Sequence, residues 1–132
     1  MTIVSAYVLD SEGLLRAVRG ERMMLARLKD AYRNGIRVVT SSMTLVEAYH
    51  GQVNLEAWNW MTSRVVVEPV TREVTDAAIA LLKDTGLHGH KHAIDAALAV
   101  ITGRQPGGVV LYTSDVDDMR KLCPPTVAVR GL

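Results

Sequence analysis

Two kinds of hydrophobic pattern alternate along this chain. Short apolar runs rich in β-branched residues are separated by longer segments in which apolar residues recur every three or four positions. The first run, IVSAYVL, stops at Asp10 and Ser11, as a buried strand would. The strands that the pattern predicts are 3–9, 36–40, 65–67 and 109–113, with 126–129 as a candidate final edge strand.

The segments between these runs have helical periodicity. In 21–33, Met24, Leu25, Leu28 and Tyr32 share one face, and Asn34-Gly35 ends the pattern. Strands that alternate with helices predict an α/β fold with a mainly parallel sheet. The predicted helices are 14–18, 21–33, 42–51, 55–62, 71–86, 90–102 and 116–122.

Composition narrows the class of protein. A length of 132 residues suits one domain spanning 1–132, and 48% apolar with 22% charged residues argues against disorder. The single cysteine, Cys123, excludes an internal disulfide and a thiolate zinc cluster. No apolar stretch approaches the about 18 residues of a membrane span, and the N-terminus lacks the features of a cleavable leader. We therefore expect a cytoplasmic protein that is not bound to a membrane.

The net charge is only +1, so binding to a nucleic acid would need a local basic patch. The segment LHGHKHAID supplies one candidate, in which His90, Lys91 and His92 could contact RNA or phosphate. Zinc binding and a merely exposed helix entry are the alternatives for this segment.

Two acidic residues directly follow predicted strands. Asp10 follows the first strand, and Asp115 follows the fourth after Thr113 and Ser114. In parallel α/β sheets the ligand crevice lies outside the carboxyl ends of the strands, which favours a functional role for both. Each could equally cap the helix that begins beside it.

Two further acids lie within apolar helices. Asp95 is surrounded by apolar residues in HAIDAALAVI, where an ionised carboxylate needs a cation or hydrogen-bond donors. A buried salt bridge with Lys91 is one explanation. Glu47 is likewise the lone charge of MTLVEAY, although it could also face solvent on a short amphipathic helix.

The four acids are more informative together than singly. If the strands that end at Asp10 and Asp115 are neighbours, Glu47 and Asp95 could join them in one crevice, where carboxylates at low dielectric repel unless a cation lies among them. Oxygen ligands favour Mg²⁺ or Mn²⁺. Such an ion can activate water against a phosphodiester. The interpretation requires that folding bring all four side chains together.

The same residues resemble a known family. VLDSEGLL, SSMTLVEAYHG, HAIDAALA and LYTSDVDD, in this order, resemble the PIN-domain family, particularly the VapC toxins of type II toxin–antitoxin pairs, over nearly the whole chain. The resemblance implies a three-layer α/β/α sandwich with a mainly parallel central sheet. It also implies a Mg²⁺- or Mn²⁺-dependent endoribonuclease, a homodimer, and a small antitoxin that blocks the acidic cleft.

The resemblance also implies roles for individual residues. Its catalytic, metal-binding acids correspond to Asp10, Glu47, Asp95 and Asp115, supported by Thr113 and Ser114. Two features depart from the commoner pattern or leave it open. Glu12 adds an acid near Asp10, and Asp118, beside Asp117, is either a further acid of the site or a first-turn residue that complements its helix dipole.

Two other functions stay open. A phospho-acceptor signalling module should have adjacent acids after the first strand and a lysine after a late strand. In this sequence Ser11, not a second acid, follows Asp10, and the third strand ends in Glu68-Pro69. The pattern therefore fits that class badly. A PIN-like domain without catalytic activity, acting only as a binding partner, is a further possibility that the sequence leaves open.

Overall fold

Five parallel strands form one sheet in the order β3-β2-β1-β4-β5. The computed structural model describes residues 3–132. Every neighbouring pair is parallel, so the mainly parallel sheet expected from the sequence is confirmed. The strands are β1 (Val4–Leu9), β2 (Arg37–Ser41), β3 (Val66–Glu68), β4 (Gly108–Thr113) and β5 (Val127–Gly131).

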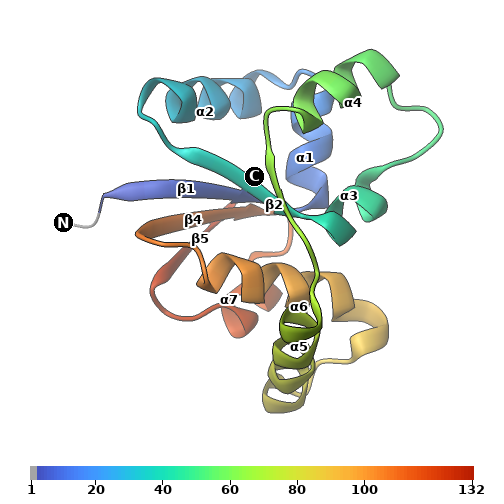
Figure 1. The fold of residues 1–132 in the computed structure, drawn as a ribbon, viewed down its shortest axis with the longest axis vertical. Coiled ribbons are helices and arrows are strands. Elements are labelled where there is room, and N and C mark those ends of the chain that lie inside the picture. Colours follow the sequence, from blue (N-terminus) through green and yellow to red (C-terminus); the bar gives the residue numbers. More distant parts are fainter. Residues whose placement is uncertain (1–2) are drawn as a thin grey trace.

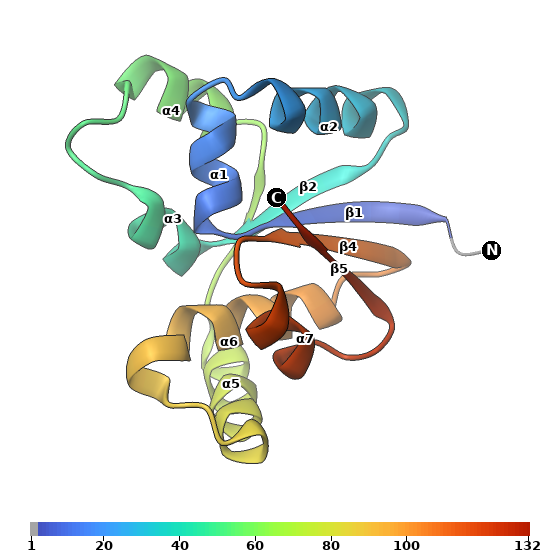
Figure 2. The same ribbon diagram turned by 180° about the vertical axis from the view of Figure 1, so that it is seen from behind.

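Both faces of the sheet are covered by helices (Figures 1 and 2). On β1, Ala6 and Val8 pack into one apolar cluster, and Leu9 packs into the other. This explains why the first strand is a continuous apolar run, since a strand buried on both faces has no polar side. The three-layer α/β/α arrangement implied by the PIN-domain resemblance is thus confirmed.

The two helical layers come from different parts of the chain. The first four helices contribute to the apolar cluster that contains Leu9, and the last three contribute to the cluster that contains Val8. The first layer has α1 (Ser11–Val18), α2 (Arg22–Arg33), α3 (Ser42–Ala48) and α4 (Leu55–Thr62), and the second has α5 (Arg72–Thr85), α6 (Gly89–Gly103) and α7 (Val116–Leu122).

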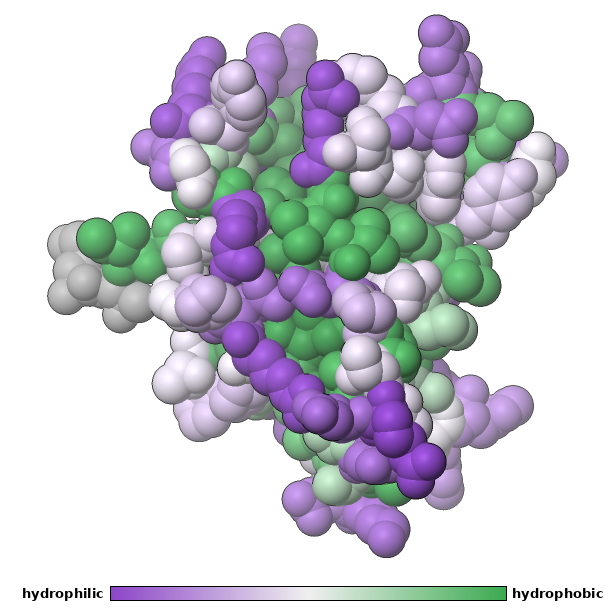
Figure 3. Space-filling model, in the orientation of Figure 1, coloured by the Kyte–Doolittle hydropathy of each residue, from purple (hydrophilic) through white to green (hydrophobic). Residues whose placement is uncertain are grey.

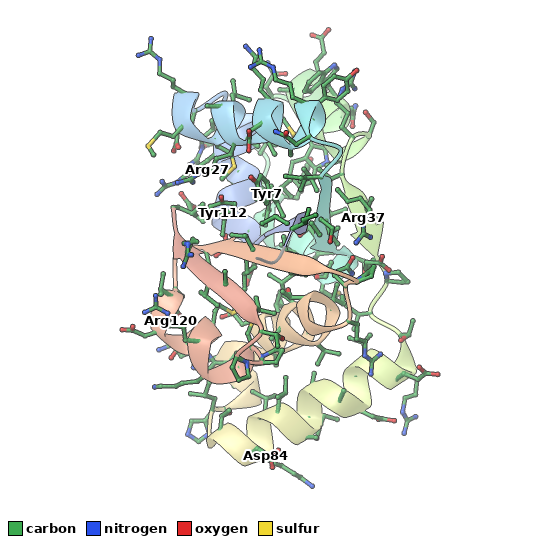
Figure 4. The ribbon with its side chains drawn as sticks, turned by 90° about the vertical axis from the view of Figure 1, so that its left-hand side faces the viewer. Tyr7, Arg27, Arg37, Asp84, Tyr112 and Arg120 are labelled. Atoms are coloured by element: carbon green, nitrogen blue, oxygen red, sulfur yellow. The ribbon has the colours of Figure 1, made fainter. Side chains whose placement is uncertain are left out.

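Contacts of aromatic residues hold α2 against the sheet. The Tyr7 hydroxyl on β1 donates a hydrogen bond of 2.9 Å to the Asp30 carboxylate on α2. The Tyr7 and Tyr112 rings meet edge to face with their centroids 5.3 Å apart, and the Arg27 guanidinium lies 4.5 Å from the centroid of Tyr112. Figure 4 shows Arg27 above these two rings. The contacts hold α2 over β1 and β4.

Helix α3 begins at one of the caps expected from the sequence but ends earlier than predicted. Ser41 caps α3, because its hydroxyl accepts a hydrogen bond of 2.9 Å from the Thr44 amide. The predicted helix 42–51 is too long, because Tyr49 adopts an extended conformation and α3 ends at Ala48. The Tyr49 ring meets the Trp58 ring edge to face, with centroids 5.5 Å apart, so beyond Ala48 the chain contacts α4 where local periodicity would continue the helix.

No helix within residues 3–132 has the length and apolarity that crossing a membrane requires.

Candidate active site

The carboxyl ends of β1 and β4 lie side by side at the centre of the sheet. From β1 the strand order runs through β2 to β3 on one side and through β4 to β5 on the other, so β1 and β4 flank the point where the topology reverses. Leu9 pairs with Tyr112, and the Asp10 amide donates to the Tyr112 carbonyl at 3.2 Å. Asp10 and the residues after β4 therefore meet where open α/β sheets bind ligands.

The Asp10 carboxylate is held by hydrogen bonds to both of its oxygens. Its Oδ1 accepts from the Gly13 amide at 2.8 Å, which caps α1. Its Oδ2 accepts from the Thr113 hydroxyl at 2.8 Å, from the Ser114 amide at 2.9 Å and, more weakly, from the Ser114 hydroxyl at 3.4 Å. Asp10 is only 6% exposed, and these donors stabilise its charge. It is both a helix cap and a fixed carboxylate at the crevice.

Thr113 connects the two acids at the strand ends. Besides donating to Asp10, its hydroxyl oxygen accepts a hydrogen bond of 2.9 Å from the Asp115 amide. Asp115 in turn caps α7, because its Oδ1 accepts from the Asp118 amide at 3.4 Å. Burial, followed by the neighbouring Asp118 carboxyl, raises the pKa of Asp115 above its usual range, and the charge of His92 opposes this rise.

The pKa of Asp95, on α6, is affected by the other three acids. Burial contributes most to a pKa raised from 3.8 to about 6, and the negative charges of Glu47, Asp10 and Asp115 raise it further. These residues come from four separate segments of the chain. The fold therefore brings the four acids predicted from the sequence into one electrostatic neighbourhood, which we call the carboxylate edge.

The carboxylate of Asp95 differs from that of Asp10 in its surroundings. Within residues 3–132, no hydrogen bond stabilises the Asp95 carboxylate, and the group that can form an ion pair with it is His92, whose Nδ1 lies 4.0 Å from Asp95 Oδ2. The salt bridge with Lys91 considered from the sequence does not form, because Lys91 is exposed one turn away. Asp95 thus carries charge at the edge without donors to stabilise it.

Glu47 lies at the rim of the edge. It is exposed on α3, a short helix that packs against both α1 and α6. Its charge nevertheless raises the pKa of Asp95. The solvent-facing position and the role at the edge, which the sequence left as alternatives, therefore hold together.

Glu12, the additional acid near Asp10, is paired with arginines. Its carboxylate lies 3.4 Å from Arg16 Nε and 3.9 Å from Arg19 Nη1. These partially exposed pairs give Glu12 cationic partners of its own.

The donor set can be tested against a divalent cation. It consists of carboxylate and hydroxyl oxygens. The pKa of Asp95 is raised first by burial and then by the charges of Glu47, Asp10 and Asp115, and a bound cation would offset both effects. Within residues 3–132, no three histidine, cysteine, aspartate or glutamate side chains are already close enough to hold one ion. The chemistry and charge of the edge fit Mg²⁺ or Mn²⁺, and binding would require the carboxylates to draw together.

The histidine segment divides between surface and interior. His90 and Lys91 are exposed at the start of α6, whereas His92 is only 6% exposed. The His92 ring faces the acids: Nδ1 lies 3.6 Å from Asp118 Oδ2. The prediction that His92 contacts RNA is therefore corrected, since its side chain is buried against the carboxylate edge. Its spacing of three residues from Asp95, which puts both on one helix face, is the sequence signal for this position.

Asp117 and Asp118 also differ in position. Asp118 has a side chain 21% exposed and faces His92, whereas Asp117 is exposed. Of the two, only Asp118 has its carboxylate directed toward the carboxylate edge.

A large groove lies away from the carboxylate edge. A groove of about 970 Å³ runs between α2, α4 and the edge of the sheet at β2 and β3, on the face where Figure 3 shows apolar side chains below α2. Among the described residues, its lining combines apolar side chains with four cationic ones and no carboxylate. The cationic residues are Lys29, Arg33, Arg37 and Arg64. We call this the basic groove.

Comparison with known proteins shows a shared fold. No protein-family model and no curated protein sequence matches the chain. A chain of the crystal structure of VapBC2 from Rickettsia felis bound to a DNA fragment from their promoter is similar, with a TM-score of 0.70. The similarity covers 96% of this protein and 98% of that chain at 15% sequence identity. The fold that the PIN-domain resemblance implies is therefore present.

Proposed function

We propose that this protein is a Mg²⁺- or Mn²⁺-dependent endoribonuclease of the VapC type, the toxin of a type II toxin–antitoxin pair. One observation carries the proposal: Asp10, Glu47 and Asp115, from separate segments, all raise the pKa of Asp95. Carboxylates concentrated at the reversal point of a parallel sheet are suited to binding a hard cation. The VapBC2 fold shared at low identity supports the same class.

The residues of the carboxylate edge would have different roles in the reaction. Asp10 and Asp115 would hold the main ion, and Asp95 and Glu47 would complete its surroundings directly or through water. Bound there, a divalent cation would supply Lewis-acid polarisation of the scissile phosphate and acidification of water. Thr113 and Ser114 would keep the Asp10 carboxylate in a fixed orientation through the hydrogen bonds described above.

Asp95 is the acid best suited to act on the attacking water. Within residues 3–132 no hydrogen bond stabilises its charge, and its pKa of about 6 suits a group that accepts a proton from water near neutral pH. Exposed His90 and Lys91, at the start of the same helix, would contact the RNA phosphates.

The test is cleavage of RNA by the purified protein with Mg²⁺, with Mn²⁺ and with EDTA. We expect cleavage only with a divalent ion, and Asp95→Asn should abolish it while the circular dichroism spectrum stays unchanged. Asp84→Asn is the matched control, because Asp84 is exposed at the end of α5 (Figure 4). Equal cleavage in EDTA, or by the Asp95 variant, would contradict the mechanism.

A binding module without catalytic activity is the competing function. It is favoured by one observation, that within the described chain no three potential ligands are already assembled around an ion position. Titration of the wild-type protein with Mn²⁺ distinguishes the two functions. Saturable binding that Asp95→Asn weakens supports the nuclease, and no binding at millimolar Mn²⁺ supports the alternative.

The partner of such a toxin would be a small antitoxin protein. The basic groove, apolar with four cations and no carboxylate in its lining, suits an amphipathic acidic segment of a partner. The VapBC2 structure to which the fold is similar is itself a complex on promoter DNA. We propose that the groove binds the antitoxin, and that the toxin is a cytoplasmic homodimer, as the resemblance implies.

Growth arrest on induced expression, relieved by a short reading frame beside the gene, tests this biological role. If Lys29→Glu with Arg33→Glu leaves the rescue and the copurification of that product intact, the groove is not its binding surface.

A further inference from the structure

The carboxylate edge contains one buried histidine that the proposed reaction does not use. His92 is 6% exposed, and its Nδ1 atom is buried with no hydrogen-bond partner among residues 3–132. A buried polar nitrogen without a partner is costly, so such a group usually has a structural or functional reason. The atom faces carboxylate oxygens: Nδ1 lies 3.6 Å from Asp118 Oδ2 and 4.0 Å from Asp95 Oδ2.

The Asp118 carboxylate is the nearer of the two. The 3.6 Å separation exceeds an ordinary N–H···O hydrogen bond by a few tenths of an ångström, which a small rotation of the Asp118 side chain would close. The other carboxylate oxygen, Oδ1, lies 3.9 Å from the Lys121 ammonium, which is on the exposed side. Asp118 therefore sits between a buried donor and an exposed cation.

We propose that His92 is a positioning residue that donates its Nδ1–H to Asp118 and holds that carboxylate at the edge, and that Asp118, not Asp117, is the further acid of the site. A neutral imidazole with its proton on Nδ1 is sufficient for this role. The effect on cleavage rests on the proposed nuclease function, whereas the hydrogen bond itself does not.

The consequence follows from the position of α7. The Asp118 amide already donates to Asp115 Oδ1, so Asp118 is the direct neighbour of an acid at the strand ends. Holding its carboxylate toward His92 fixes how much negative charge faces Asp115. Loss of His92 would let Asp118 turn toward Lys121 and solvent, away from the edge.

The hydrogen bond can be tested without any nuclease activity. Long-range ¹H–¹⁵N spectra of protein labelled at histidine nitrogen distinguish the two neutral tautomers. We expect the Nδ1–H tautomer for His92, and we expect Asp118→Asn to shift its ring signals while Asp117→Asn leaves them unchanged. An Nε2–H tautomer, or equal shifts in the two variants, would overturn the proposal.

Kinetics test the positioning role. We expect His92→Ala to lower kcat by about 10- to 100-fold with little change in KM, as is typical when a group that orients a ligand is removed. His92→Asn should restore part of kcat, because its amide can donate where the imidazole did. Asp117→Asn is the control and should keep the wild-type rate.

The outcomes separate the two proposals. If His92→Ala loses no more activity than Asp117→Asn, or if His92→Asn is as slow as His92→Ala, His92 has no positioning role although the nuclease proposal stands. If no variant and no wild-type protein cleaves RNA, the nuclease proposal fails and the spectra still decide the hydrogen bond. Should His92→Ala not fold, His92→Asn and the Asp118→Asn spectra provide the same decision.

Discussion

The carboxylate edge has two sides that differ in how their charge is stabilised. On the strand side, Asp10 accepts hydrogen bonds from Gly13, Thr113 and Ser114. On the helix side, within the part of the chain described, Asp95 has no such donor and its pKa rises to about 6. The charge of Asp10 is thus stabilised by donors within the fold, whereas the charge of Asp95 has only His92 at 4.0 Å beside it and would be stabilised further by an added cation. The same residue type therefore contributes to stability on one side and opposes it on the other.

The largest effect should come from the helix side. Asp95→Asn should lower the rate of RNA cleavage by about 10²- to 10⁴-fold, because it removes a carboxylate that binds or accepts a proton. Without metal at pH 7.5 it should also stabilise the fold by about 1–3 kcal/mol, since it removes a charge that burial and the neighbouring acids both disfavour. Cleavage assays and urea denaturation measure the two. A loss of stability would contradict the comparison.

The strand side should respond with the opposite sign. Asp10→Ala should destabilise the fold by about 2–4 kcal/mol, because it removes the α1 cap and leaves the buried Thr113 hydroxyl and the partly buried Ser114 amide without their acceptor. Urea denaturation without metal measures the change. If Asp10→Ala and Asp95→Asn shift stability in the same direction, the two sides are not different in kind.

The dependence of stability on pH should also distinguish the helix side from the strand side. The folded pKa of Asp95 lies above its unfolded value of 3.8, so the native state holds the proton more tightly than the unfolded state. The stability that this provides is complete below about pH 4 and is lost as pH rises through about 6, up to about 3 kcal/mol. Asp95→Asn should lack this component in denaturation curves between pH 4 and 7.

Added Mn²⁺ should then recover the lost stability above pH 6 in the wild-type protein, because it binds the folded state. An equal gain in Asp95→Asn would show that the ion binds elsewhere.

Two substitutions at neighbouring positions give the smallest effects. Thr113→Val should cost about 1–2 kcal/mol, because Thr113 is 1% exposed and its hydroxyl bonds both Asp10 and the Asp115 amide. Ser114→Ala should cost less than about 0.5 kcal/mol, because Ser114 is exposed and its hydroxyl contact with Asp10 is 3.4 Å long. Thermal denaturation of the pair checks the order, and equal costs would mean that Thr113 is not the linking residue.

Much of the fold could be predicted because it depends on local pattern. Apolar runs buried on both faces, and caps such as Ser41, are properties of a few consecutive residues. The end of α3 could not be predicted in this way, since Tyr49 leaves the helix to contact Trp58 nine positions along the chain. Periodicity contains no information about such a contact.

The candidate site, like the fold, could be predicted only in part. The sequence singled out Asp10, Glu47, Asp95 and Asp115 because acids at strand ends and in apolar helices are unusual. It offered His92 as a possible RNA contact, which its burial contradicts, since a pattern does not show which helix face turns inward. For the same reason it did not separate Asp117 from Asp118.

By itself, then, the sequence determined the order of strands and helices and which side chains were chemically out of place, because both follow from neighbours along the chain. Only the tertiary structure decided which acids lie close enough to interact electrostatically and which of them have hydrogen-bond donors. Electrostatic energy depends on distance through space, and hydrogen bonds on the direction of groups that lie 103 positions apart, as Asp10 and Thr113 do.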